Sequence, residues 1–89
     1  MEEQDIDTHR IDAATLALMF LTLHDANRIS GTCRAWKSFD WSALGRLHDR
    51  GWIHDPVGKA KSVVLTPVGL ERCEQLLRQL FCARPKDPV

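Results

Sequence analysis

The basic side chains of this 89-residue chain are concentrated in its middle third, although the whole chain carries a net charge of zero. Residues 28–61 hold seven Lys and Arg against three Asp, a net +4, whereas residues 1–27 hold one base and six acids, a net −5. Guanidinium groups match base edges and phosphates, and ammonium groups attract the phosphate backbone. A basic segment of this kind is typical of a nucleic-acid face, with a solvated surface that binds nothing as the alternative.

The cysteines and histidines do not fall at the spacings of a metal site. The sequence has no Cys-x-x-Cys and no His-Glu-x-x-His motif, so it predicts no zinc or other metal site and no disulfide framework. His48 and Asp49 are adjacent, and adjacent helical residues do not face each other, so they do not form an acid–base pair. We therefore expect a protein that is not an enzyme and has no cofactor.

A short helix and a β-hairpin are predicted in the middle of the chain. Asp40 can cap a helix that begins at Trp41, and a glycine at position 51 favours its end. Trp41, Leu44 and Leu47 lie three apart and form the expected buried face. Residues 52–54 and 62–65 are the two expected strands, and the Asp-Pro-Val-Gly turn between them leads to a basic tip.

An amphipathic helix is predicted at the end of the chain, from Pro67 to about Ala83. Thr66 can cap it, and proline fits a first helical position because its missing amide hydrogen has no partner there. Residues 84–89 contain two prolines and are expected to be a disordered tail. Apolar residues recur at spacings of three and four, which is the pattern of a half-buried helix: Leu70, Cys73, Leu76, Leu77, Leu80 and Phe81.

The N-terminal third is predicted to be a flexible acidic leader, residues 1–10, and an apolar helix capped by Asp12. The run from Ala13 to Leu23 has only two polar residues but is shorter than the ~20 residues that cross a bilayer. We therefore expect no membrane segment. Either this helix is buried completely by its own chain, or part of it contacts a second copy or another protein. The candidate contact residues are Leu16, Met19, Phe20 and Leu23.

The segment Asn27–Phe39 admits two interpretations. Residues 24–32 contain Asn, Ser and Gly, which favour a loop. Trp36 and Phe39 are three apart, which favours a helical turn, and a short strand over residues 34–39 is the alternative. Residues 11–83 are then one domain, and the absence of a secretion signal in the acidic N-terminus indicates a cytoplasmic protein.

The middle of the chain resembles the winged-helix module of bacterial transcription regulators. The resemblance consists of L-x-x-L-x-x-x-G-x-I, a tip containing Gly and Lys, and V-V-L-T-x-x-G. It implies an α+β fold with three main helices and a two-stranded hairpin, the wing, between the second-to-last and last helices. The residues that carry it are Leu44, Leu47, Gly51, Ile53, Gly58, Lys59, Val63, Val64, Leu65, Thr66 and Gly69.

A second resemblance covers most of the chain. The segments RAWKSFDW and DPVGKAKSVVLT are similar to those of a family of small bacterial proteins whose domain is of unknown function. This resemblance implies no activity.

The winged-helix resemblance implies that the helix before the hairpin reads the major groove and that the wing touches the adjoining backbone. Ser42, Arg46 and Arg50 are then the expected readers, and Lys59 and Lys61 the phosphate contacts. On this basis we expect a dimeric DNA-binding regulator. The alternative is a protein-interaction module that uses the same fold without nucleic acid, which the zero net charge and the apolar first helix favour.

Overall fold

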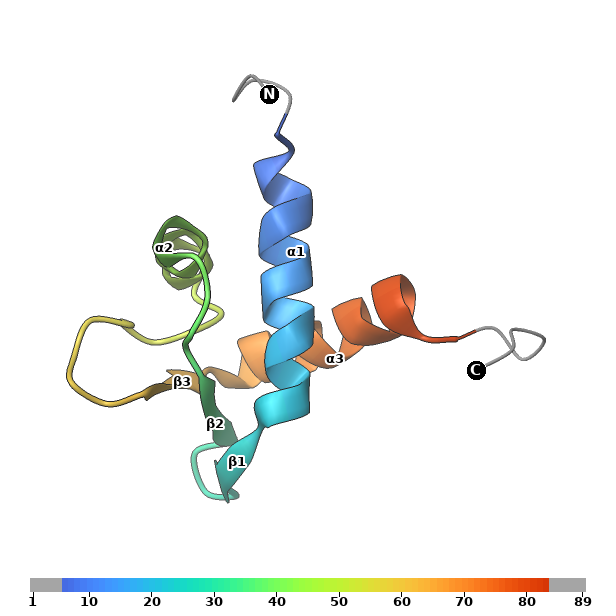
Figure 1. The fold of residues 1–89 in the computed structure, drawn as a ribbon. Coiled ribbons are helices and arrows are strands. Elements are labelled where there is room, and N and C mark those ends of the chain that lie inside the picture. The colour runs from blue at the N-terminus through green and yellow to red at the C-terminus, as the bar shows by residue number, and fades with distance from the viewer. Residues whose placement is uncertain (1–5, 84–89) are drawn as a thin grey trace.

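The computed structural model describes residues 6–83 (Figure 1). Helix α1 stands upright in this view, α3 crosses it, and the strands and α2 lie on one side of the crossing. The elements in chain order are α1 (Thr8–Met19), the 3-10 turn η2 (Phe20–Thr22), β1 (His24–Asn27), β2 (Thr32–Trp36), α2 (Trp41–Asp49), β3 (Ser62–Leu65) and α3 (Pro67–Phe81).

The α+β class and the three helices are confirmed, but the predicted two-stranded sheet is wrong. The sheet has three antiparallel strands in the order β1-β2-β3, and β3 pairs with β2 from Cys33↔Leu65 to Trp36↔Ser62. The expected first strand, residues 52–54, is reduced to an Ile53↔Leu65 bridge and a bond from the His54 amide to the Val64 carbonyl, 2.8 Å. The longer partner, β2, occupies the other edge of β3.

The segment that the sequence left open is a β-hairpin. Of the two interpretations of residues 34–39, the strand is correct for Arg34 to Trp36, because Cys33 and Ala35 point into the core while their neighbours point out. The expected loop over residues 24–32 holds β1 and a tight turn. In this turn the Asn27 side chain accepts bonds from the Ile29 and Ser30 amides at 3.0 and 3.2 Å.

Two of the three expected helix caps are confirmed. The Asp40 carboxylate accepts a bond from the Ala43 amide and the Thr66 hydroxyl accepts one from the Gly69 amide, both 3.0 Å. Asp12 does not cap α1, because the helix starts earlier and Asp7 accepts from the Arg10 amide. Residues 8–10 are thus helical rather than part of a flexible leader. The remaining leader residues 1–5 and the expected tail 84–89 lie outside the described residues.

The core lies where α1, α2, α3 and the inner face of the sheet meet. Leu16 and Met19 are fully buried in it, so they cannot form the expected contact face of α1, and Phe20 and Leu23 are only half-buried. Trp41 was also expected in the core but is 56% exposed. It precedes the buried stripe of α2, which consists of Ala43, Leu44 and Leu47.

A backbone contact joins the end of α2 to the start of α3. The Thr66 amide donates to the Trp52 carbonyl at 3.1 Å, and the Thr66 hydroxyl donates to the Gly51 carbonyl at 2.7 Å. Gly69 lies so close to this carbonyl that a Cβ at position 69 would overlap the Trp52 oxygen. The T-x-x-G signature therefore has a steric cause: only glycine lets α3 approach the turn.

Candidate nucleic-acid interface

The outer face of the sheet carries polar and aromatic side chains. Because Cys33 and Ala35 point inward, Arg34 and Trp36 point outward. The Arg34 guanidinium donates to the Ser62 hydroxyl of β3 at 2.7 Å and to the Ser62 carbonyl at 3.2 Å. The Trp36 ring, in a residue 49% exposed, lies 4.6 Å from the His24 ring. The sheet thus presents a fixed cation next to an accessible aromatic surface.

The loop of residues 54–61 is fastened to the sheet by a lysine. The Lys37 ammonium donates to the Pro56 carbonyl at 2.6 Å and to the Gly58 carbonyl at 3.0 Å, and Pro56 itself is buried. The Lys37 amide also donates to the Lys61 carbonyl at 3.1 Å. Lys59 and Lys61 are exposed on this loop. Their positive charges are therefore held beside the sheet and remain open to solvent.

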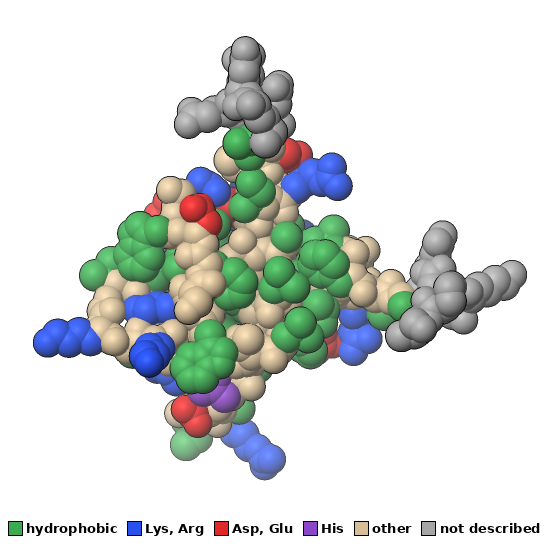
Figure 2. Space-filling model, in the orientation of Figure 1, with side chains coloured by type: hydrophobic (Ala, Val, Ile, Leu, Met, Phe, Trp, Pro, Cys, Tyr) green, Lys and Arg blue, Asp and Glu red, His purple; other side chains and the backbone are tan. Residues whose placement is uncertain are grey.

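Positive charge collects on this side of the molecule. Residues 24–37 and 54–61 hold five bases and two acids, a net +3. Figure 2 shows Lys and Arg side chains over the loop and around the lower end of the sheet. We call this region the sheet–loop surface, and its members are His24, Arg28, Arg34, Trp36, Lys37, Lys59 and Lys61.

The expected reader residues of α2 are not grouped on one free face. Ser42 is exposed near the start of the helix. Arg46 reaches back to α1, where its guanidinium donates two bonds to the Asp12 carboxylate at 2.6 and 2.8 Å. Arg50 bonds His9 at 2.9 Å and lies 5.2 Å from the centre of the Trp52 ring. The two arginines thus already have partners within the chain.

Asp12 explains why Arg46 is held in place. Its side chain is only 2% exposed, whereas that of Arg46 is 35% exposed. The hydrogen bond to Asp12 raises the pKa of Arg46 above its ordinary value, and the Coulomb attraction of the same carboxylate adds to this. A buried carboxylate needs a partner of opposite charge, and this bidentate pair supplies it. The pair fixes α2 against α1.

Sequence reasoning therefore found Ser42, Lys59 and Lys61 on accessible surface, and it missed the contribution of the first hairpin. Arg34 and Trp36 are two apart, the spacing of residues on one face of a strand. If the segment Thr32–Trp36 is interpreted as a strand with this period, both side chains are expected on the outer face of the sheet. Arg28 had no such signal, because it lies in the β1–β2 turn, whose bounds depend on the pairing of the strands.

Two further observations bear on what this part of the chain can do. Within residues 6–83, every helix is too short or too polar to cross a bilayer. Over the same described residues, no three His, Cys, Asp or Glu side chains come together as a metal site would require.

Comparisons with known proteins agree with the second resemblance of the sequence. The family model described as Domain of unknown function (DUF6429) matches residues 7–83. The chain is 54% identical over 77 residues to the "Uncharacterized protein y4hR" of Sinorhizobium fredii (strain NBRC 101917 / NGR234), an alignment covering 86% of this chain and 96% of that protein. No solved structure matches the chain.

Proposed function

The chain belongs to the DUF6429 family of domains of unknown function, and we propose that it is a winged-helix-like protein that binds duplex DNA through its sheet–loop surface. The observation that carries this proposal is the grouping of Lys59 and Lys61 with the cations of the first hairpin. Phosphate contacts supply most of the affinity of such surfaces, and they need cations that are exposed and held in place.

The order of elements supports the winged-helix part of the proposal. Helix α2 is followed by the basic loop, then by β3 and α3, which is the order of reader helix, wing and final helix. The Ile53↔Leu65 bridge stands where the first wing strand would be. The loop of residues 54–61 is then the wing.

The residues on and just after α2 have different roles in the proposed complex with DNA. Ser42 is exposed in the first turn of α2, and in this proposal it contacts the duplex at that end of the helix. Arg46 has a positioning role, since it holds α2 on α1 through Asp12. Arg50 is exposed at the other end of the helix and contacts the duplex only where the DNA extends past α2. Sequence readout by α2 is therefore weaker than backbone contact.

Fluorescence anisotropy with a labelled mixed-sequence duplex tests this function. The double variant Lys59→Ala/Lys61→Ala should weaken binding at low salt about tenfold or more, and should lower the slope of log K against log salt by about 2. The control Arg72→Ala, compared with the single variant Lys59→Ala, removes one charge from α3, outside both the loop and the hollows of the protein. Equal losses in these two single variants, or no binding by the unchanged protein at low salt, would contradict the proposal.

The second candidate is a protein-interaction module without nucleic acid. It is favoured by the large apolar side chains that α1, η2 and α3 leave exposed, among them Leu21 at 69% and Phe81 at 51%. A stable protein partner together with no change in anisotropy on any duplex would support this candidate over DNA binding.

A further inference from the structure

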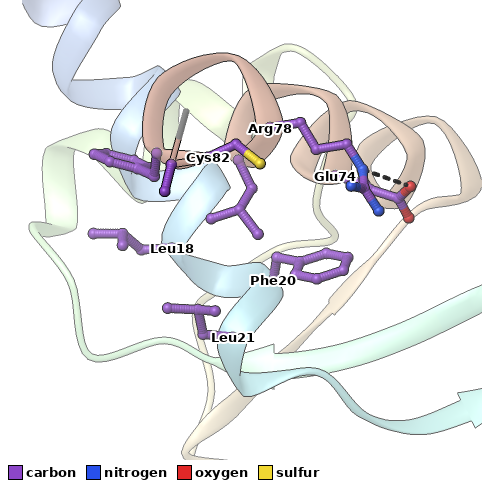
Figure 3. A pocket seen from close by; sticks show the side chains of 9 residues that line it. Leu18, Phe20, Leu21, Glu74, Arg78 and Cys82 are labelled. Carbon is purple, nitrogen blue, oxygen red and sulfur yellow. Dashed lines mark hydrogen bonds and ion pairs between the residues drawn. The ribbon is translucent and has the colours of Figure 1, made fainter. Parts of the chain in front are cut away.

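The last turns of α3 lie across α1 from the loop of residues 54–61 (Figure 1), and hydrophobic side chains gather on this side of α1 (Figure 2). This surface contains two hollows, of about 560 and 370 Å³, and Phe81 lines both. Figure 3 shows the larger one, with Leu18, Phe20 and Leu21 facing Arg78 and Cys82 across it. We call this surface the α1–α3 face; its exposed large apolar residues are Ile11, Leu18, Leu21, Leu80 and Phe81.

The area of this face matches one half of a dimer interface. The exposed fractions of its five large apolar residues run from 38% to 69%. With on the order of 200 Å² for each such side chain when fully exposed, they leave roughly 500 Å² of apolar surface. A standard interface buries about 800 Å² on each partner, of which about 60% is apolar. The α1–α3 face thus has about as much apolar surface as one partner buries in a standard interface.

The shape and charge of the face are self-complementary about Phe81. On one side of Phe81 lies the smaller hollow, lined by Ala13 and Ala14 and by Arg10. On the other side Leu21 projects, 69% exposed, and Glu74 lines the larger hollow. Glu74 also makes an exposed ion pair with Arg78 at 3.4 Å, and such a pair is weak enough to leave Glu74 available to a second cation. A two-fold axis near Phe81 places Leu21 of one copy over the alanines of the other and Arg10 opposite Glu74.

We propose that the α1–α3 face binds the same face of a second copy, in a two-fold symmetric dimer with Leu21 in the alanine-lined hollow. The residues on this face have no part in the sheet–loop surface, so the dimer does not depend on DNA binding. The dimer goes beyond the proposed function because it brings two sheet–loop surfaces into one assembly. A duplex that reaches both then gains affinity from the linkage of two sites.

Sedimentation equilibrium of the full chain over a series of protein concentrations tests this. The unchanged protein should show a monomer–dimer equilibrium. Leu21→Lys should raise the dissociation constant about tenfold or more, because it puts a second cation beside Arg10 in the alanine-lined hollow. The control Val68→Lys changes a residue that is 63% exposed near the start of α3 and should leave the equilibrium unchanged. A monomer at every concentration, or equal behaviour of the two variants, would overturn the proposal.

A charge exchange tests the symmetry separately. Arg10→Glu and Glu74→Arg should each weaken the dimer, because each places like charges opposite one another. The double variant restores an opposite pair and should recover the affinity. Circular dichroism shows that each variant is folded. If the double variant dimerises no more tightly than the single variants, the two-fold arrangement is overturned, and the proposal with it.

Discussion

The sheet–loop surface and the α1–α3 face differ in net charge and in the polarity of most of their side chains. Residues 24–37 and 54–61 carry a net +3, whereas residues 8–22 and 66–83 hold three bases and three acids, a net zero. The first surface is held by hydrogen bonds from Lys37 and Arg34, and the second consists of apolar side chains around two hollows. Electrostatic contact is screened by salt, whereas apolar contact is not. The small domain thus separates two kinds of recognition on two sides.

Both surfaces depend on the contact between Gly69 and Trp52, so a change there should have the largest effect. In Gly69→Ala the new methyl group overlaps the Trp52 carbonyl, which forces α3 away from the turn. We expect the free energy of unfolding to fall by about 3 kcal/mol or more, and both DNA binding and dimerisation to weaken. Urea unfolding followed by circular dichroism measures the first of these.

Gly45→Ala is the matched control for this change. Gly45 lies inside α2 and a Cβ there meets nothing within 4 Å. Alanine should therefore stabilise the protein, by about 0.8–1 kcal/mol. If both glycine variants are equally stable, the steric account of Gly69 is wrong.

The next largest effect is expected from salt, which should weaken DNA binding more than dimerisation. Raising the salt concentration should lower the association constant K for the duplex. Each phosphate contact contributes a slope of about −0.9 to the plot of log K against log salt. The affinity of the dimer should change much less, because its contact is mainly apolar and only its Arg10–Glu74 pairs are screened. Lys59→Ala/Lys61→Ala should weaken DNA binding without weakening the dimer. Anisotropy and sedimentation on the same samples measure both, and a dimer that loses as much affinity with salt as the duplex complex does would contradict the comparison.

A smaller effect is expected from Cys73, which is buried at the contact of α3 with the core. Burial raises the pKa of its thiol from 9.0 to about 11, because the charged thiolate would lose its water. In the unfolded chain the thiol loses its proton first, so stability should fall as pH rises from 9.0 towards 11. Cys73→Ala should remove this part of the alkaline loss. Unfolding midpoints over this pH range measure it, and equal slopes in both proteins would refute it.

The smallest effect is expected at the exposed thiol. Cys82 is exposed and lines the larger hollow, whereas Cys33 and Cys73 are buried. A maleimide should therefore modify Cys82 first, and a few-fold more slowly at concentrations where the dimer forms. Leu21→Lys should remove this dependence on protein concentration. Mass spectrometry at several times measures the rates, and equal reactivity of the three thiols would count against the packing of α3.

Local signals in the sequence predicted much of the fold, and they failed where distant segments meet. The caps at Asp40 and Thr66 and the helix before the glycine at position 51 depend on neighbouring residues and were correct. The partner of β3 was wrong, because strand pairing depends on which distant strand reaches that edge. The Asp12–Arg46 pair was missed for the same reason, since the two residues are 34 positions apart and each had a plausible local role.

For the candidate site too, local signals in the sequence were sufficient for some residues and tertiary packing decided the others. The exposed lysines of the loop could be found from the sequence, since a turn between apolar segments is usually on the surface. The exposed side of α1 could not be found, because the run from Ala13 to Leu23 is apolar on nearly every side. The packing of α1 and η2 against the other helices and the sheet decides that Leu16 is buried and Leu21 is exposed.

The most direct test of DNA binding by the sheet–loop surface is a titration of isotope-labelled protein with a mixed-sequence duplex, followed by amide chemical shifts at low and high salt. We expect shifts in the β1–β2 hairpin, around Ser42 and over residues 54–61, which disappear at high salt. Shifts confined to α1 and α3, or no shifts at low salt, would contradict the account.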